Sequence, residues 1–232
     1  MRGPSFTGPM AKLFGNHAGF SANLEIQNGA DGEMKIPAKL AFRDGKSRME
    51  MDMSPSRRNS APGDTSERIK AMGMDQMILI NRPDRKVQYS INPTLKAYVE
   101  QPLTDPEATK SPEDFTVTTT LITRETVDGH DCEKNRVEIA DKEGSKQIMT
   151  AWNAKDLDKF PVKIEQTQNG QLSTILFKDI KLTKPDGALF EPPQEFTKYN
   201  SYPEMFRTEM MKNYKGGQRV PGEPRAPQPP RE

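Results

Sequence analysis

Residues 161–182, PVKIEQTQNGQLSTILFKDIKL, contain two runs in which apolar and polar side chains alternate. Alternation with a period of two is typical of a β-strand that buries one face. Between the runs lies Asn169-Gly170, which favours a two-residue turn because both residues tolerate the positive φ angles that such a turn needs. The stretch therefore predicts a β-hairpin, and it is the strongest hairpin signal in the chain.

Similar runs fill most of the sequence between residues 20 and 182, and turn-forming pairs such as Asp44-Gly45 and Asp128-Gly129 separate them. About ten strands in succession are predicted in this way. Strands do not alternate with long helices, so a parallel sheet is not expected. These patterns favour a mainly β protein with minor α, built on a single curved antiparallel sheet.

The ends of the chain differ in composition from its middle. Residues 1–19 are rich in Gly and Pro without periodicity and are expected to form a flexible lead-in. Residues 20–200 are expected to form one domain, and the apolar spacing within residues 201–215 predicts a short helix. Five prolines follow within residues 216–232, which predicts a disordered tail.

The overall charge and composition exclude several classes of function. Lys plus Arg number 34 and Asp plus Glu number 33, so no basic field is available to attract nucleic acid. No run of about 18 apolar residues is present to span a membrane as a helix. Cys132 is the single cysteine, so no internal disulfide can form. A monomer is expected.

Residues suited to catalysis are scarce. The two histidines are His17, in the expected lead-in, and His130, in a predicted turn. His130, Asp131 and Cys132 are consecutive, but neighbours on a strand point to opposite faces and a fourth metal ligand is missing. Glycine-rich nucleotide-binding motifs are absent as well. We therefore expect no enzyme activity, no cofactor and no metal.

Methionine is abundant, with 13 in the chain, and SRMEMDMS at residues 47–54 places three of them at every second position. Met49, Met51 and Met53 would share one face of a strand, with charged residues on the other. Methionine fills irregular space in cores and also lines sites that accept ligands of variable shape. Spacing alone leaves both possibilities open, packed core or ligand pocket.

The order of several short motifs resembles the LolA/LolB-like lipoprotein-carrier superfamily, including its lipoprotein-sorting-like relatives of unknown function. The carrying segments are TVDGHDCEKNRVEI, QIMTAWNAKDLDKFPVKIEQTQNGQLSTILFKDIKL and DGALFEPPQEFTKY. In the first half, FSANLEI, GKSRMEMDM and DQMILINRPDRKVQYSINPTLKAYVEQPL occupy the places of the opening strands. The similarity extends over about residues 20–200.

This resemblance implies an unclosed β-barrel of about 10–11 antiparallel strands with short helices covering its concave face. It further implies a non-enzymatic binder of a lipid, a lipoprotein acyl chain or another long hydrophobic ligand. An exported, periplasmic or cell-envelope location with a removed signal peptide would follow, and an envelope protein could be a partner. The alternative is a structural, interaction or sensor protein on the same scaffold without a transported ligand. The candidate cavity residues are Met49, Met51, Met53, Met77, Leu79, Tyr89, Tyr98, Met149 and Trp152.

Overall fold

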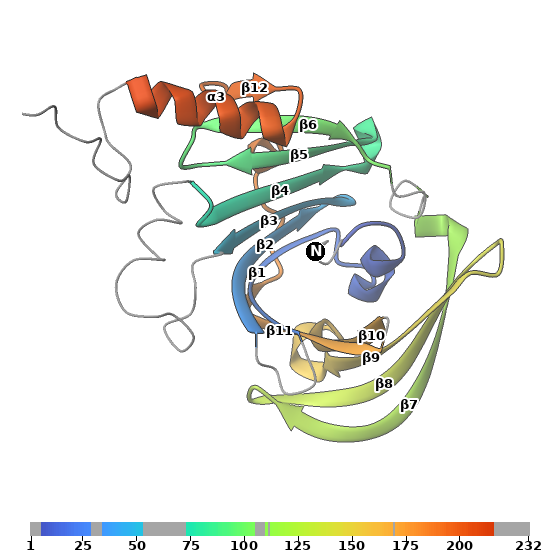
Figure 1. The fold of residues 1–232 in the computed structure, drawn as a ribbon. Coiled ribbons are helices and arrows are strands. Elements are labelled where there is room, and N and C mark those ends of the chain that lie inside the picture. Colours follow the sequence, from blue (N-terminus) through green and yellow to red (C-terminus); the bar gives the residue numbers. More distant parts are fainter. Residues whose placement is uncertain are drawn as a thin grey trace, which may run out of the picture.

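The computed structural model describes residues 6–28, 34–52, 73–104, 110, 112–168 and 170–215. Strands dominate it (Figure 1). They are β1 (Gly19–Asn28), β2 (Met34–Arg43), β3 (Lys46–Asp52), β4 (Gln76–Arg82), β5 (Val87–Asn92), β6 (Ala97–Pro102), β7 (Phe115–Val127), β8 (His130–Asp141), β9 (Lys146–Ala154), β10 (Pro161–Gln168), β11 (Gln171–Lys181) and β12 (Thr197–Tyr199). The 3-10 helices are η1 (Gly8–Phe14), η2 (Pro83–Arg85), η3 (Pro112–Asp114), η4 (Lys155–Leu157) and η5 (Gly187–Phe190), and the α-helix α3 spans Tyr202–Lys215.

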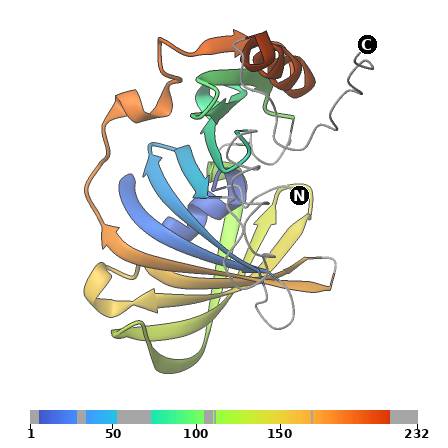
Figure 2. The same cartoon turned by 60° about the vertical axis from the view of Figure 1, so that its left-hand side comes forward.

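All twelve strands form one sheet in the order β12-β6-β5-β4-β3-β2-β1-β11-β10-β9-β8-β7. Neighbouring strands are antiparallel except for β12, which pairs with β6 in parallel. The sheet curls without closing into a barrel (Figure 2). The predicted fold class is therefore confirmed, with a larger strand number than expected, because the three-residue β12 carries no sequence signal of its own.

Tight turns appear where the sequence predicted them. Asp44 (φ 49°) and Gly45 (φ 79°) join β2 to β3, while Asp128 (φ 50°) and Gly129 (φ 84°) join β7 to β8. Both residues of each pair have positive φ, as a type I′ turn requires. These turns fix the register of the two hairpins.

Irregular positions in three strand pairs accompany the curvature. The register shifts in β1–β11, β9–β10 and β7–β8. In the first of these, Asp179 has a φ of 50° and accepts a hydrogen bond of 2.7 Å from Asn23 Nδ2. Bulges increase local twist and bend the strand that contains them. The sheet can therefore curl around the segment that fills its concave side.

The N-terminal segment lies inside the curve of the sheet. Pro9 lies in the first turn of η1, and Gly15, with a φ of 58°, follows its last residue. Phe6 and Phe14 are each 1% exposed in the main core. The expectation of a flexible lead-in over residues 1–19 does not describe residues 6–18. The Gly and Pro content wrongly indicated flexibility, because these residues form the turns of the segment. Its few large apolar side chains anchor it in the core.

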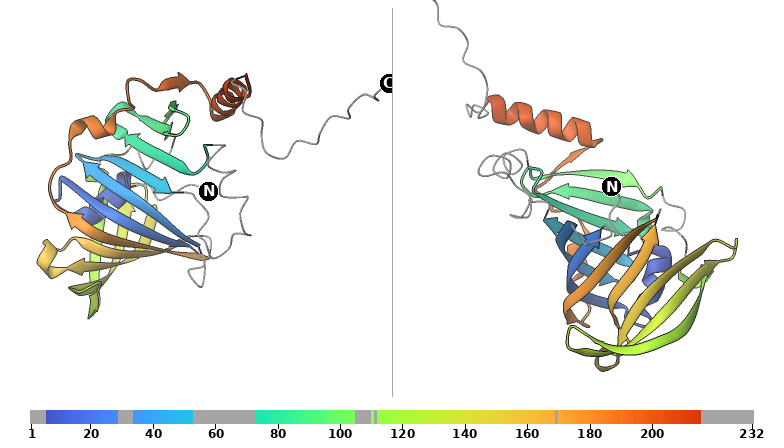
Figure 3. Two further views of the ribbon diagram at one scale, coloured as in Figure 1. Left: turned by 90° about the vertical axis from the view of Figure 1, so that its left-hand side faces the viewer. Right: turned by 60° about the horizontal axis from the view of Figure 1, so that its bottom comes forward.

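The C-terminal segment uses both faces of the sheet (Figure 3). Residues 182–196, here called the strap, cross the convex face from β11 towards β6, and Phe190 of η5 is fully buried there with Ile80, Tyr89 and Ile91. After β12, α3 packs Met205 against Ala97 and Val99. These β6 residues lie opposite Asn92 and Ser90, which places α3 on the same concave side as η1. The predicted helix over residues 201–215 coincides with α3, and the predicted tail lies outside the described residues.

Candidate functional site

The centre of the concave face is an aromatic core organised around Phe14 of η1. Its ring lies 4.6 Å from that of Phe20, 5.5 Å from that of Phe42 and 5.7 Å from that of Phe160, centroid to centroid. No side chain caps the start of η1 with a hydrogen bond. This segment is therefore held in the concavity mainly by apolar packing.

Next to this core, β3 and β4 present the methionine patch, defined as Met49, Met51, Met77 and Leu79. Met49 lies opposite Leu79 and Met51 opposite Met77 across the two strands. Met49 is buried at 4% exposure, whereas the other three side chains are only half-buried. Among the described residues, the patch lies between the area covered by η1 and the area covered by α3.

A polar row borders the patch on the same face. Asn81 donates to Ser47 Oγ at 3.1 Å and accepts from Gln88 Nε2 at 2.7 Å. Ser47 and Asn81 are buried, so their mutual hydrogen bonds offset the loss of water. The concave face therefore carries a buried polar row between the methionine patch and the apolar contact of α3 with β6.

A cavity of about 370 Å³ lies where β3 ends and β4 begins, and it shares Asn23, Lys39 and Glu50 with a smaller cavity on the convex face. Met51 and Met77 line it together with Leu24, Ala38 and Ile78. Charged side chains, Lys39, Glu50 and Asp52, line its other parts. Ligand sites in proteins commonly enclose several hundred Å³ and combine an apolar wall with a few polar groups. This cavity has the size and the mixed lining of such a site.

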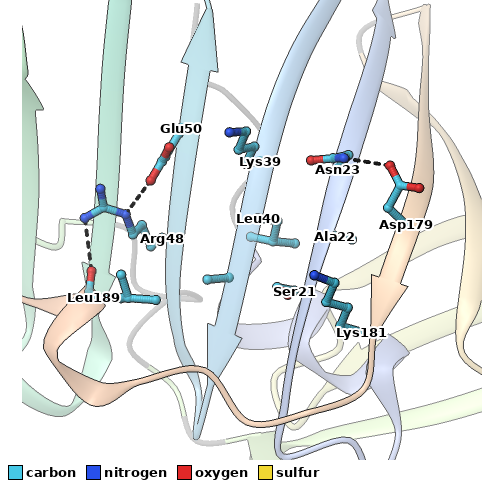
Figure 4. A pocket seen from close by; sticks show the side chains of 11 residues that line it. Ser21, Ala22, Asn23, Lys39, Leu40, Arg48, Glu50, Asp179, Lys181 and Leu189 are labelled. Atoms are coloured by element: carbon cyan, nitrogen blue, oxygen red, sulfur yellow. Dashed lines mark hydrogen bonds and ion pairs between the residues drawn. The ribbon is translucent and has the colours of Figure 1, made fainter.

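A smaller cavity of about 220 Å³ lies between the strap and the convex face (Figure 4). Leu189 of the strap borders it, and Lys39 and Lys181 reach towards it from β2 and β11. Arg48 donates to Glu50 at 2.8 Å and to the Leu189 carbonyl oxygen at 3.1 Å. The second bond anchors the strap to the sheet.

The structure places eight of the nine candidate residues, and it divides them between the two faces. Met49, Met51, Met77 and Leu79 form the patch, and Met149 is buried in the same core. Tyr89 and Tyr98 lie on the convex face beneath the strap, because Tyr89 pairs with Ile80 while Leu79 pairs with Ser90. Met53 lies outside the described residues. The concave face therefore brings together five of the nine.

Trp152 also lies on the convex face. Its ring is sandwiched between the ammonium groups of Lys134 and Lys163, at 4.8 Å and 4.2 Å from the ring centroid, and its indole N–H donates to Glu125. That hydrogen bond is the main reason why the pKa of Glu125 is lowered. Trp152 is three residues from Met149, so period two already places the two on opposite faces.

Sequence reasoning missed the residues that anchor the strap. Arg43 donates to the Pro185 carbonyl oxygen at 2.7 Å, and Arg82 donates to the Phe190 carbonyl oxygen at 3.3 Å. The Arg82 side chain is 7% exposed and also pairs with Asp84 and Glu191. Hydrogen bonds from its guanidinium to Asp84, and then to Glu191, raise the pKa of Arg82 despite its burial. Single arginines at the ends of strands, such as these two, carry no distinguishing signal in one sequence.

The groups that could do chemistry are engaged in structure. His130 Nδ1 lies 2.7 Å from an Asp156 oxygen, which lowers the pKa of Asp156. Burial raises the pKa of the Cys132 thiol, the opposite of what a thiolate nucleophile needs. No cluster of metal-ligating side chains occurs among the described residues. The same part of the chain contains no helix long and apolar enough to cross a membrane.

Comparison with protein families identifies the class. Residues 20–159 match the family described as Domain of unknown function (DUF4412). Because this match covers more than half of the 232 residues, the chain belongs to that family. None of the proteins with curated descriptions matches it.

Several solved structures are similar to the chain. An uncharacterized conserved protein from Thermus thermophilus is 12% identical with a TM-score of 0.49, covering 83% of this chain and 97% of its own. A LolA superfamily protein from Nitrosomonas europaea is 10% identical with a TM-score of 0.43, covering 80% and 98%. A putative outer membrane lipoprotein-sorting protein domain from Vibrio parahaemolyticus is 13% identical with a TM-score of 0.39, covering 78% and 92%. The second of these structures is described by the name of the superfamily that the sequence resembles.

Proposed function

We propose that this protein binds a long apolar ligand, such as a lipid or a lipoprotein acyl chain, on the concave face of its sheet without covalent chemistry. The observation that carries the proposal is the methionine patch. Three of its side chains, Met51, Met77 and Leu79, are half-buried beside a fully packed core. An acyl chain laid on this patch would gain about 0.8 kcal/mol for each methylene removed from water.

The flexibility of the lining supports a ligand of variable length. Methionine has three rotatable side-chain bonds and a polarizable sulfur, so Met51 and Met77 can adapt to different chains. The neighbouring η1 is short and lacks a side-chain cap. Its displacement would enlarge the apolar surface from the patch towards Phe14. We further propose an exported protein of the cell envelope, in keeping with the sequence resemblance.

The proposal is tested by lipid extraction and probe binding. Protein purified from a lipid-containing host is extracted with solvent, and copurified acyl species are identified by mass spectrometry. Binding of the apolar fluorescent probe N-phenyl-1-naphthylamine is then compared between wild type and the Met51→Glu and Met77→Glu variants. We expect at least about tenfold weaker probe binding in each variant, equivalent to about 1.4 kcal/mol.

Ile148→Glu is the matched control. Ile148 is 45% exposed and lies opposite Glu138 on the convex face, so it receives the same charge change away from the patch. Melting curves for all variants separate lost binding from lost folding. Absence of both copurified lipid and probe binding in the folded wild type would refute the proposal.

A structural or interaction role is the second candidate, and one observation favours it. Phe14 of η1 already occupies the centre of the concavity at 1% exposure. A protein whose own segment fills the concave side needs no transported ligand, and its strap or α3 could serve an envelope partner instead. The same lipid extraction distinguishes the two roles.

A further inference from the structure

The two edge strands of the sheet differ in length and in how far they are covered. At one edge, β12 has three residues and α3 packs beside it. At the other, β7 has thirteen residues, and all side chains from Thr116 to Thr126 are exposed. Within the described part of the chain, β7 pairs with β8 alone. One long strand edge is therefore open.

The sequence of β7 lacks the features that usually protect an open edge. Such edges are normally short, or carry Lys or Pro. The stretch FTVTTTLIT, residues 115–123, contains no charge and no proline and is rich in β-branched residues. Its exposed side chains include Val117 at 41%, Leu121 at 49% and Ile122 at 54%. This edge is suited to pairing with another strand.

The backbone register shows which N–H and C=O groups of β7 point to the open edge. Asp141 of β8 donates its N–H to the Ser145 carbonyl oxygen on the β9 side, at 3.0 Å. Odd-numbered residues of β8 therefore turn towards β9 and even-numbered residues towards β7, since direction alternates along a strand. The β7 residues opposite odd-numbered β8 residues turn away from β8. Three of them direct N–H and C=O to the open edge: Val117, Thr119 and Leu121.

These three residues are related symmetrically about Thr119. A second copy paired antiparallel about this point would place Thr119 against its own counterpart and Val117 against Leu121 of the second copy. Val117 and Thr119 lie opposite the buried Ile139 and Val137, so the new apolar pairs would extend the concave face. Beyond this stretch, the end of one β7 that contains Arg124 and Glu125 would approach the Glu113 and Asp114 end of the other.

We propose that a second copy of this chain is the partner of β7, forming a two-fold symmetric dimer whose two sheets join across the antiparallel β7 edges. Self-pairing is favoured because the uncharged stretch brings no like charges together and because its edge-facing residues are arranged symmetrically about Thr119. From sequence alone we expected a monomer. The open edge revises that expectation, and it does so independently of any ligand on the concave face.

Mass measurements on the full chain test the dimer. Light scattering at rising concentration should show a mass approaching twice 26.1 kDa for the wild type. Thr119→Pro removes an N–H that faces the open edge and leaves the ladder to β8 intact, so the variant should remain folded and monomeric. Ile148→Lys, an exposed substitution on the convex face of β9, should leave the dimer unchanged. A dimer that survives Thr119→Pro would overturn the proposal.

Cysteine crosslinking makes the test decisive for a weak dimer. Hydrogen-bonded antiparallel pairs have Cα atoms about 5.5 Å apart, within the range that a disulfide spans. Thr119→Cys should therefore crosslink two copies under mild oxidation, while Thr126→Cys, equally exposed but far from the symmetry point, should not. The native Cys132 is 1% exposed and should not compete. Equal crosslinking of both variants, or of neither, would refute the two-fold pairing.

Discussion

The two segments that cover the concave face, η1 and α3, are held by different physical forces. Phe14 packs η1 into a cluster of aromatic rings, without a side-chain cap. Helix α3 combines the buried Met205 with ionisable groups, since Lys212 donates to Glu209 at 2.8 Å and to the Tyr199 hydroxyl at 3.1 Å. Apolar packing does not depend on pH, whereas an ion pair is lost when its carboxylate becomes protonated. The two covers should therefore detach under different conditions.

The largest expected effect comes from breaking the η1 side. Phe14→Ala removes a ring at the centre of the core, and Phe→Ala substitutions at such sites cost about 3–5 kcal/mol. The free energy of unfolding, measured in denaturant, should fall by this amount across the whole domain. Leu189→Ala, at a strap residue that is 41% exposed, provides the control. A loss below about 1 kcal/mol for Phe14→Ala would show that η1 is not part of the core.

Breaking the α3 side should have a smaller and more local effect. Met205→Ala should cost about 2 kcal/mol, the lower end for a buried methionine, because α3 can detach while the rest of the sheet stays folded. Hydrogen exchange should accelerate at the amides of α3 and β12 and remain unchanged in β1. Acceleration in β1 by the same factor would contradict separate covers.

Acidification should release α3 before η1. Desolvation raises the pKa of Glu209, but hydrogen bonds from Lys212 and Tyr199 outweigh it, so the pKa lies below the ordinary value for a glutamate. A carboxylate with a lowered folded-state pKa stabilises above its unfolded pKa, and this contribution is lost as pH falls through the folded pKa. NMR spectra should therefore show α3 resonances changing below about pH 4.3 while η1 resonances stay fixed.

Glu209→Gln sharpens the pH experiment. Glutamine keeps a hydrogen-bond acceptor for Tyr199 and Lys212 but does not titrate. Docking of α3 should be weaker at neutral pH in this variant and should show no further acid transition. An unchanged acid transition in the variant would assign the effect to another carboxylate.

The smallest effect is expected at the start of α3. The Ser201 hydroxyl accepts a hydrogen bond from the Glu204 N–H at 3.3 Å, while the Glu204 carboxylate accepts one from the Asn200 N–H at 3.1 Å. This reciprocal arrangement resembles a capping box. Ser201→Ala should cost about 1 kcal/mol, detected as faster hydrogen exchange in the first turn of α3 only. Faster exchange along the entire helix would indicate that the cap controls docking.

Much of the sheet could be predicted because alternation and turn chemistry are local signals. Asp44-Gly45 and Asp128-Gly129 form the expected tight turns, and the expected helix corresponds to α3. The faces of β4 could not be predicted. Met77, Ile78, Leu79 and Ile80 are consecutive and apolar, because one face of β4 carries the methionine patch and the other lies beneath the strap. Alternation is lost in such a strand, so the sequence does not show that Tyr89 shares the convex face with its partner Ile80.

The sequence by itself determined that this chain forms one curved antiparallel sheet and that Met49 and Met51 share a face, because side-chain direction along a strand depends only on local backbone geometry. Tertiary structure alone decided which part of the concave face is covered and which edge of the sheet stays unpaired. Burial of Phe14 against Phe20, Phe42 and Phe160 depends on residues up to about 150 positions apart. Contacts at that separation leave no periodic trace in a single sequence, so only the folded chain distinguishes the filled part of the concavity from the half-buried methionine patch.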